Sequence, residues 1–434
     1  SRLLPSFYLR YSLEGQLRIE NYWSYSAAHE KKHEGVASLE ETTTLVHNAL
    51  NRRSGKTSKL CAIWDGTLSG LTAAALLGQS QARGKHLFFL RSDMDPTIRE
   101  RLDAQGVTFH DEPVTEKPAH TLLPALVWEL DEPIATADAP ALRQIAERLA
   151  DQGATLLSSA GAQTLFGPPP RLQERRTGSF LSQLLNLLPE KLMLSGVIPI
   201  TRYLNRNWSY ELLRRYYRTA LHGNYLRARA LFVEQEIADL SPLLHNCFNA
   251  DVFLHKFHNL SRIQNRDLEL MYVDAKSRLP DSTLFMHESI CRNLGADCIA
   301  PLLDVDLVEH LATLDPSARG LSGTENGLLR QLLCHWLDLP EDTVFPPSYI
   351  EAAPNERELL LSLAPRLVDA ELVHAGLIQR SGMRRLLMHA QKKDLPLRQA
   401  WAVLVLEVYY RMFFNHPIGP RAPDRSLLEF LQES

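Results

Sequence analysis

The chain has 434 residues, a formal net charge of −4 at pH 7, 45% hydrophobic residues and 23% charged residues. This length fits one large domain or two ordinary ones, and the composition is typical of a globular protein that buries a core. The charge argues against a dominant nucleic-acid surface, because proteins that bind phosphate backbones usually carry a clear basic excess.

The cysteines and the apolar segments indicate the cellular compartment. The five cysteines include no C-x-x-C pair, which favours reduced thiols. The sequence begins with Ser1 rather than Met and shows no signal peptide, so we expect the natural protein to extend upstream. Residues 401–414 are too few to span a bilayer and contain Glu407 and Arg411. We therefore expect a cytoplasmic protein without membrane contact, in which this segment is a buried helix.

The first half of the chain predicts a hairpin followed by alternating strands and helices. Residues 7–11 and 17–19 alternate apolar and polar side chains about a turn, residues 23–38 are polar, and 40–53 have helical periodicity. A buried strand is predicted at 60–64, then a turn at 65–70, a helix at 71–77, and further strands at 86–90 and 154–157. This order predicts an α/β fold, a parallel sheet with helices on both faces, whose ligands bind beyond the carboxyl ends of the strands.

The second half is predicted to be helical. Residues 171–236 are basic and aromatic, and the rest of the chain to about 414 consists of helical patterns broken by Pro and Gly. The basic stretch at 214–229 could bind nucleic acid or an acidic partner, but its spacing is also that of an amphipathic helix with snorkelling arginines. We favour the helix and expect no nucleic-acid partner.

Two short motifs carry little weight. His29 and His33 fit the H-E-x-x-H zinc pattern, but this helix would have lysines inside the motif and no third ligand nearby, so we expect no metal there. Residues 55–57, Gly-Lys-Thr, resemble the end of a P-loop that lacks its first glycine and its preceding strand.

Several segments together resemble the asparagine synthetase family. The first, AIWDGTLSGLTAAALL at 62–77, is similar to the family's strand, S-G-G-x-D-S loop and Ala-rich helix, and the second, LLSSAGAQTLFG at 156–167, to its L-L-S-G-E-G-A-D-E-L-F-G. Residues 131–134 match its D-E-P motif, 297–309 are similar to E-V-R-x-P-F-L-D-x-x-L-V-E, 404–413 to its C-terminal L-E-L-W helix, and 7–23 to the end of its glutaminase domain. The resemblance is collinear over most of the chain and weakest at 171–250. It implies an ATP-pyrophosphatase-like domain, shared with lasso-peptide cyclases and β-lactam synthetases.

The resemblance also implies a chemistry. In the family the first loop cradles pyrophosphate with backbone N–H groups, and two aspartates hold Mg²⁺. A glutamate in the second motif assists proton transfer, and a lysine nearer the C-terminus neutralises the transferring phosphate. A carboxylate is adenylated and then joined to an amine.

This chain departs from the family at each of these positions. In the first loop Asp65 stands for the serine, Thr67 for a glycine and Ser69 for the metal-binding aspartate. In the second motif and beyond, Ala160 replaces the catalytic glutamate, Gln163 the second aspartate, Thr164 the next glutamate and Asn326 the lysine. The packing positions are retained, namely Gly66, Leu68, Gly161, Leu165, Phe166, Gly167 and Pro301.

These substitutions predict a large loss of ATP affinity. A carboxylate about 4 Å from a phosphate charge repels it by roughly 1–4 kcal/mol, depending on screening. We expect no catalytic residue, no metal and no cofactor. The candidate ligand-binding cleft comprises Asp65, Gly66, Thr67, Leu68, Ser69, Asp131, Glu132, Ser159, Gly161 and Gln163.

Three functional hypotheses remain. The first is a catalytically silent accessory or scaffold in a peptide or antibiotic pathway, with a peptide or a partner enzyme as its partner. The second is an active ATP-dependent, Mg²⁺-dependent amide- or lactam-forming enzyme in which Asp65, Asp131, Glu132 and Glu288 take over lost roles. The third is a pocket rebuilt for another small ligand. Because this chain has no glutaminase half, we expect no glutamine-dependent reaction. The oligomeric state is left open.

The expected organisation has three parts. Residues 1–37 form a remnant hairpin and linker, 38–345 the α/β domain with a helical insert at about 171–250, and 346–434 a helical tail.

Overall fold

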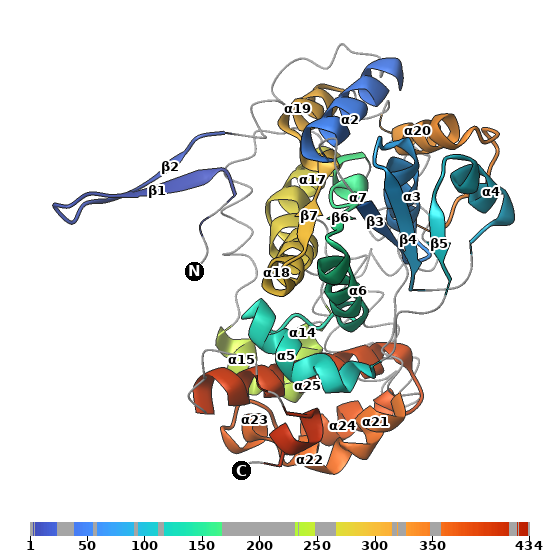
Figure 1. Cartoon of the computed structure of the whole chain (residues 1–434). Helices are drawn as coiled ribbons and strands as arrows, with labels where there is room; N and C mark the ends of the chain where they lie inside the picture. The colour runs from blue at the N-terminus through green and yellow to red at the C-terminus, as the bar shows by residue number, and fades with distance from the viewer. Residues whose placement is uncertain are drawn as a thin grey trace, which may run out of the picture.

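A computed structural model describes residues 3, 5–23, 39–54, 59–90, 94–111, 117–166, 231–232, 234–247, 266–314, 319, 327–347, 357–415, 423 and 425–432 of the chain. Its centre is a five-stranded sheet with the strand order β5-β4-β3-β6-β7, in which every pairing is parallel (Figure 1). The strands are β3 (Lys59–Trp64), β4 (Gly84–Phe89), β5 (Thr108–His110), β6 (Thr155–Leu157) and β7 (Asp297–Ile299). The predicted α/β fold is confirmed, including the strands expected near 60, 86 and 154.

Alternation along β3 and β4 divides the core between the two faces of the sheet. Leu60, Ala62 and Trp64 pack into one hydrophobic cluster, whereas Cys61 packs into another. Leu87 and Phe88 on β4 divide in the same way. Because successive side chains of a strand point to opposite faces, this pattern requires an apolar cover on each side of the sheet.

Helices supply both covers. The first cluster is formed with residues of α2 (Leu39–Ser54), α3 (Leu68–Gln79), α4 (Pro96–Ala104), α7 (Ala162–Phe166), α17 (Arg266–Lys276), α19 (Val305–Thr313) and α20 (Gly327–Leu337). The second is formed with α5 (Ala119–Leu130), α6 (Ala139–Gln152) and α18 (Phe285–Leu294). A π-helical turn, Leu279–Leu284, leads into α18, and a 3₁₀ turn, Pro301–Leu303, follows β7.

The C-terminal part is helical, as the sequence predicts. It comprises α21 (Arg357–Ser362), α22 (Ala364–Val368), α23 (Glu371–His374), α24 (Arg380–Ala390), α25 (Asp394–Tyr410), the π-helical turn Arg411–Asn415 and α26 (Leu427–Phe430). These helices share a third hydrophobic cluster with Leu123 and Val127 of α5. The buried helix expected at 401–414 is confirmed, since Trp401 and Leu404 lie in this cluster. No helix among the described residues is long and apolar enough to cross a membrane.

The predicted hairpin is also present. Strands β1 (Phe7–Tyr11) and β2 (Leu17–Asn21) pair antiparallel and project away from the other labelled elements (Figure 1). Of the predicted insert at 171–250, the described residues contain α14 (Glu234–Leu240) and α15 (Pro242–Cys247). The expected domain boundaries near 37 and 345 stay predictions.

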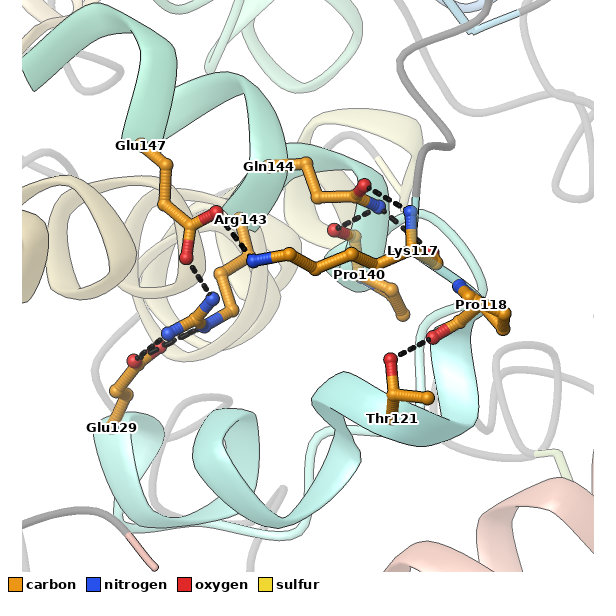
Figure 2. Close-up of polar contacts among 8 residues, drawn as sticks. All are labelled: Lys117, Pro118, Thr121, Glu129, Pro140, Arg143, Gln144 and Glu147. Atoms are coloured by element: carbon orange, nitrogen blue, oxygen red, sulfur yellow. Dashed lines mark hydrogen bonds and ion pairs between the residues drawn. The ribbon is translucent and has the colours of Figure 1, made fainter. Parts of the chain in front are cut away.

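A charged network joins α5 to α6 (Figure 2). The Arg143 guanidinium donates to both carboxylate oxygens of Glu129, with nitrogen-to-oxygen distances of 2.8–3.1 Å, and also to Glu147. The Glu129 side chain is only 6% exposed. Burial raises the pKa of the Glu129 carboxyl, whereas Arg143 acts to lower it. The carboxylate therefore depends on Arg143 for its charge compensation.

Replacing Arg143 with Ala should destabilise the fold by about 3–5 kcal/mol, because it leaves the buried Glu129 charge uncompensated. The matched control is Arg101→Ala, which removes a pair with Asp338 whose partners are 45% and 86% exposed. That change should cost at most about 1 kcal/mol. Thermal and chemical denaturation measure both, and equal losses would contradict this assignment.

Candidate functional site

A cavity of about 360 Å³ lies at the carboxyl ends of β3 and β6. These two neighbouring strands are where the chain order of the sheet reverses, with β4 and β5 on one side and β7 on the other. Open α/β sheets bind ligands at this switch point, because the loops leaving the two strands diverge there. The cavity is therefore where the sequence predicts a ligand.

The first wall is the loop between β3 and α3. The Asp65 Oδ1 atom accepts hydrogen bonds from the Thr67 backbone N–H at 2.9 Å and from the Thr67 hydroxyl at 2.6 Å. Thr67 is the N-cap of α3, and its hydroxyl oxygen accepts the Gly70 N–H at 3.2 Å. A helix N-cap whose side chain bonds the third residue of the helix fixes the first turn. The helix therefore begins at Leu68, three residues before its predicted start at 71.

This loop places a carboxylate against a helix N-terminus. A methyl group at Gly70 would lie only 2.3 Å from Asp65 Oδ1, so the carboxylate sits directly over the first turn of α3. The Leu68 N–H is also occupied, because it donates to the Pro347 carbonyl at 3.0 Å. The N–H groups of Thr67, Leu68 and Gly70 are thus already bonded to protein oxygen atoms. An N-terminus of this kind attracts anions through its N–H groups and dipole, and here the chain supplies the anion itself.

The second wall is the loop after β6. Ser158 Oγ accepts the Ala160 N–H at 3.1 Å and lies 2.8 Å from His287 Nδ1 of α18. Gly161 has a φ of +99°, and a methyl group there would come within 2.9 Å of Leu303, so both the conformation and the space require glycine. Desolvation lowers the pKa of the His287 ring to about 4, which keeps it neutral near pH 7.

The third wall comes from distant parts of the chain that the sequence did not indicate. Asp274 of α17 is 2% exposed and accepts a hydrogen bond from the Thr164 hydroxyl at 3.1 Å. Arg278 follows one helical turn later, and Asp138 and Arg398 line the cavity from α6 and α25. For this wall, the four-residue spacing of Asp274 and Arg278 is a signal in the sequence that could have placed these two charged side chains on one helix face.

The candidate residues fall into two groups. Asp65, Thr67, Ser69, Ser159, Gly161 and Gln163 line the cavity, together with the substituted position Ala160. Gly66 and Leu68 belong to the same loop without lining it, and Leu68 is buried in the core.

Three acidic residues lie elsewhere. Asp131 ends α5 in a left-handed conformation with φ 57°, exposed to solvent, and Glu132 follows it. Neither lines the cavity, because the chain reaches its wall only at 135–138. Glu288 pairs with Arg292 along α18 and also lies outside the cavity walls.

Several predicted features lie outside the described residues. They are the H-E-x-x-H pattern at 29–33, the Gly-Lys-Thr run at 55–57, the basic stretch at 214–229, Gly167 and Asn326. Within the part of the chain that the structure describes, no group of three or more His, Cys, Asp or Glu side chains is placed to hold a metal ion.

The neutral His287 predicts a specific dependence of stability on pH. Its folded pKa of about 4 lies below the ordinary value of 6.5. Between pH 4 and pH 6.5 the His287 ring binds a proton in the unfolded chain but not in the folded one. The neutral ring's contribution to the free energy of unfolding is therefore complete above pH 6.5 and is lost as the pH falls toward 4. Replacing His287 with Gln should reduce the slope of the free energy of unfolding against pH in this range by up to roughly 1 kcal/mol per pH unit.

Thermal unfolding across that range measures the effect. Ser158→Ala is the control, since it removes the same hydrogen bond but keeps the titrating ring, and it should retain the decline. A His287→Gln variant whose stability falls as steeply as that of the natural chain would contradict the buried neutral ring.

Comparison with known proteins identifies the family. Residues 74–411 match the asparagine synthase family model, so the match begins within α3, after the Asp65 loop. The comparison with curated proteins gives no match. A match over more than half of the 434 residues, on a parallel sheet of the expected kind, shows membership. The chain belongs to the asparagine synthase family, whose members are ATP-dependent synthetases that form amide bonds.

Proposed function

We propose that this chain is a non-catalytic member of its family, which serves as an accessory or scaffold protein. The observation that carries the proposal is the Asp65 carboxylate over the first turn of α3. In the family the corresponding loop receives pyrophosphate, and here the protein's own anion is in its place. A phosphate approaching this N-terminus meets N–H groups that are already bonded and a charge of its own sign.

The electrostatic cost is large enough to matter. At about 4 Å, two unit charges repel by about 1 kcal/mol in water and about 4 kcal/mol near a protein surface. Each 1.4 kcal/mol of repulsion lowers the affinity for ATP about tenfold. The affinity falls further because the N–H groups of the helix N-terminus are already bonded to protein oxygen atoms. The first loop therefore does not fit the triphosphate of ATP in the manner of the family.

The second loop supports the same proposal. Ala160 and Gln163 line the cavity where the resemblance implies a proton-transferring glutamate and a metal-binding aspartate. An amide side chain offers Mg²⁺ a neutral oxygen instead of the carboxylate it prefers. The residues of this loop supply neither the charge for a metal nor a group to move a proton.

The biological setting is a further part of the proposal. We place the chain in a cytoplasmic pathway of peptide or antibiotic assembly, where its partner is a peptide or an active enzyme. The free thiols of Cys61, Cys291 and Cys334, all buried, suit a reducing compartment. The setting itself rests on analogy with the family relatives named above.

A second candidate is an active amide- or lactam-forming synthetase with a rebuilt site. The observation in its favour is that Asp138 and Asp274 line the cavity together with Asp65. Carboxylates from new positions would then bind Mg²⁺, and the phosphates of ATP would bind through the metal ion. In this case replacing Asp274 with Asn should abolish ATP-dependent turnover.

Restoring the family loop should restore nucleotide binding. Calorimetric titration with ATP and Mg²⁺ should give no heat of binding for the natural chain and measurable binding for the triple variant Asp65→Ser/Thr67→Gly/Ser69→Asp. Asp131→Ser, which removes an exposed carboxylate outside the cavity, is the control and should leave the natural chain unable to bind. Micromolar Mg²⁺-dependent binding by the natural chain would refute the non-catalytic proposal and favour the rebuilt site.

A further inference from the structure

Two histidines join β4 to β5. The His86 Nδ1 atom lies 3.1 Å from the His110 Nε2 atom, so the two imidazole rings share a hydrogen bond. The register pairs His86 with Thr108 and Phe88 with His110, so the two rings meet diagonally across the strands on one face of the sheet. The His110 ring also stacks on Phe88, with ring centroids 4.4 Å apart. The histidine pair, His86 and His110, therefore helps to attach β5 to β4.

The rest of this attachment is small and does not titrate with histidine. β5 has three residues, and β4 is the strand that pairs with it within the described part of the chain. On the other face of β5, the Phe109 ring lies 4.3 Å from the Arg99 guanidinium, which also pairs with Asp111 at 2.6 Å. The hydrogen bond from Arg99 lowers the pKa of the Asp111 carboxyl, so both charges persist in mild acid. The histidine pair is thus the part of the attachment that responds to pH near the ordinary histidine value.

The hydrogen bond between the two rings limits how many protons the pair can hold. One ring must donate and the other must accept. A first added proton is tolerated, because the ring that carries it still donates to its neutral partner. A second added proton leaves two charged N–H groups facing each other without an acceptor, and the two rings repel. Separated rings have no such limit, so acid favours the separated state.

Burial and neighbouring charges act on the same equilibrium. Burial lowers the pKa of His86 most, and His110 and Lys59 of β3 lower it further. Burial is also the main cause that lowers the pKa of His110, followed by Arg148 of α6, whereas Asp111 acts to raise it. Both folded pKa values therefore lie below the ordinary value of 6.5. The contribution of the pair is complete above pH 6.5 and is lost as the pH falls.

We propose that the histidine pair makes the attachment of β5 sensitive to pH, so that β5 separates from β4 in mild acid while the other strands stay paired. β5 stands at the end of the strand order β5-β4-β3-β6-β7, so it can leave without interrupting the pairing of the others. The cavity lies at β3 and β6, on the far side of β4. The inference is therefore independent of whether the cavity binds a nucleotide.

Amide hydrogen exchange of the full chain between pH 7 and pH 5 tests the separation. The peptide 107–111, which contains β5, should lose protection by up to about tenfold per pH unit, because opening takes up one net proton. The peptide 296–300 is the internal control, since β7 is also a three-residue strand at an end of the sheet and contains no histidine. Any loss of global stability, including that from His287, affects both peptides. The ratio of their protection should therefore fall with pH, and a constant ratio would overturn the proposal.

Substitutions assign the effect to the pair. Glutamine does not titrate and keeps a hydrogen-bonding side chain, so the double variant His86→Gln/His110→Gln should make the ratio independent of pH. Each single variant should reduce the fall, and these serve if thermal unfolding shows that the double variant does not fold. The matched control is His335→Gln, which removes an exposed histidine of α20 outside the pair and should keep the full fall. A fall that persists unchanged in both single variants would refute the role of the pair.

Discussion

The hydrogen bonds from Thr67 to the Asp65 carboxylate organise the region on which the functional account depends. They set the first turn of α3, require glycine at position 70 and direct a negative charge at the helix N-terminus. The helix that follows is almost wholly buried against the sheet, which leaves the loop little freedom to rearrange. This one local contact caps the helix, and in the proposed function it also opposes the binding of phosphate.

The retained and the altered positions obey different physical constraints. Leu68, Leu165 and Phe166 are buried in one cluster, where a change in volume costs stability whatever the function. Gly161 is held by its positive φ and by the contact that a methyl group would make with Leu303. Asp65 and Gln163 line the cavity and are only partly buried, so packing constrains these two positions less; Ala160 also lines the cavity but is buried against Leu279 and Ala300. The proposed non-catalytic role expects this division, with the packing positions of the family kept and its chemical positions replaced.

Local patterns in the sequence predict much of the fold. The apolar runs at 60–64 and 86–90 identify β3 and β4 because these strands are buried on both faces. Strands β5 and β7 were not predicted from their patterns, since each has three residues and is partly exposed. The N-cap at Thr67 was not predicted either, because the sequence at 65–70 indicates a turn before the helix, whereas residues 68–70 form its first turn.

The site could be predicted only in part. The loops after β3 and β6 lie together because these strands are neighbours in the sheet. The two family motifs in the sequence, each following a predicted strand, were enough to predict that these loops meet. Asp274 meets Thr164 at a separation of 110 residues, and no periodicity in the sequence specifies such a contact. Asp131 and Glu132 resemble a family motif, but they lie at the end of α5, before the chain reaches the cavity wall at 135–138. The charge of Asp65 was evident from the sequence, whereas its direction toward the helix N-terminus required the structure.

The most direct measurement is the formation of AMP and pyrophosphate from ATP by the purified chain with Mg²⁺ and a panel of carboxylate and peptide substrates. A non-catalytic chain should release no more AMP and pyrophosphate than a heat-inactivated sample. Release that depends on Mg²⁺ and disappears in an Asp65→Ala or Asp274→Asn variant would contradict the proposed function, because the cavity would then perform the activation step that its residues are proposed to have lost.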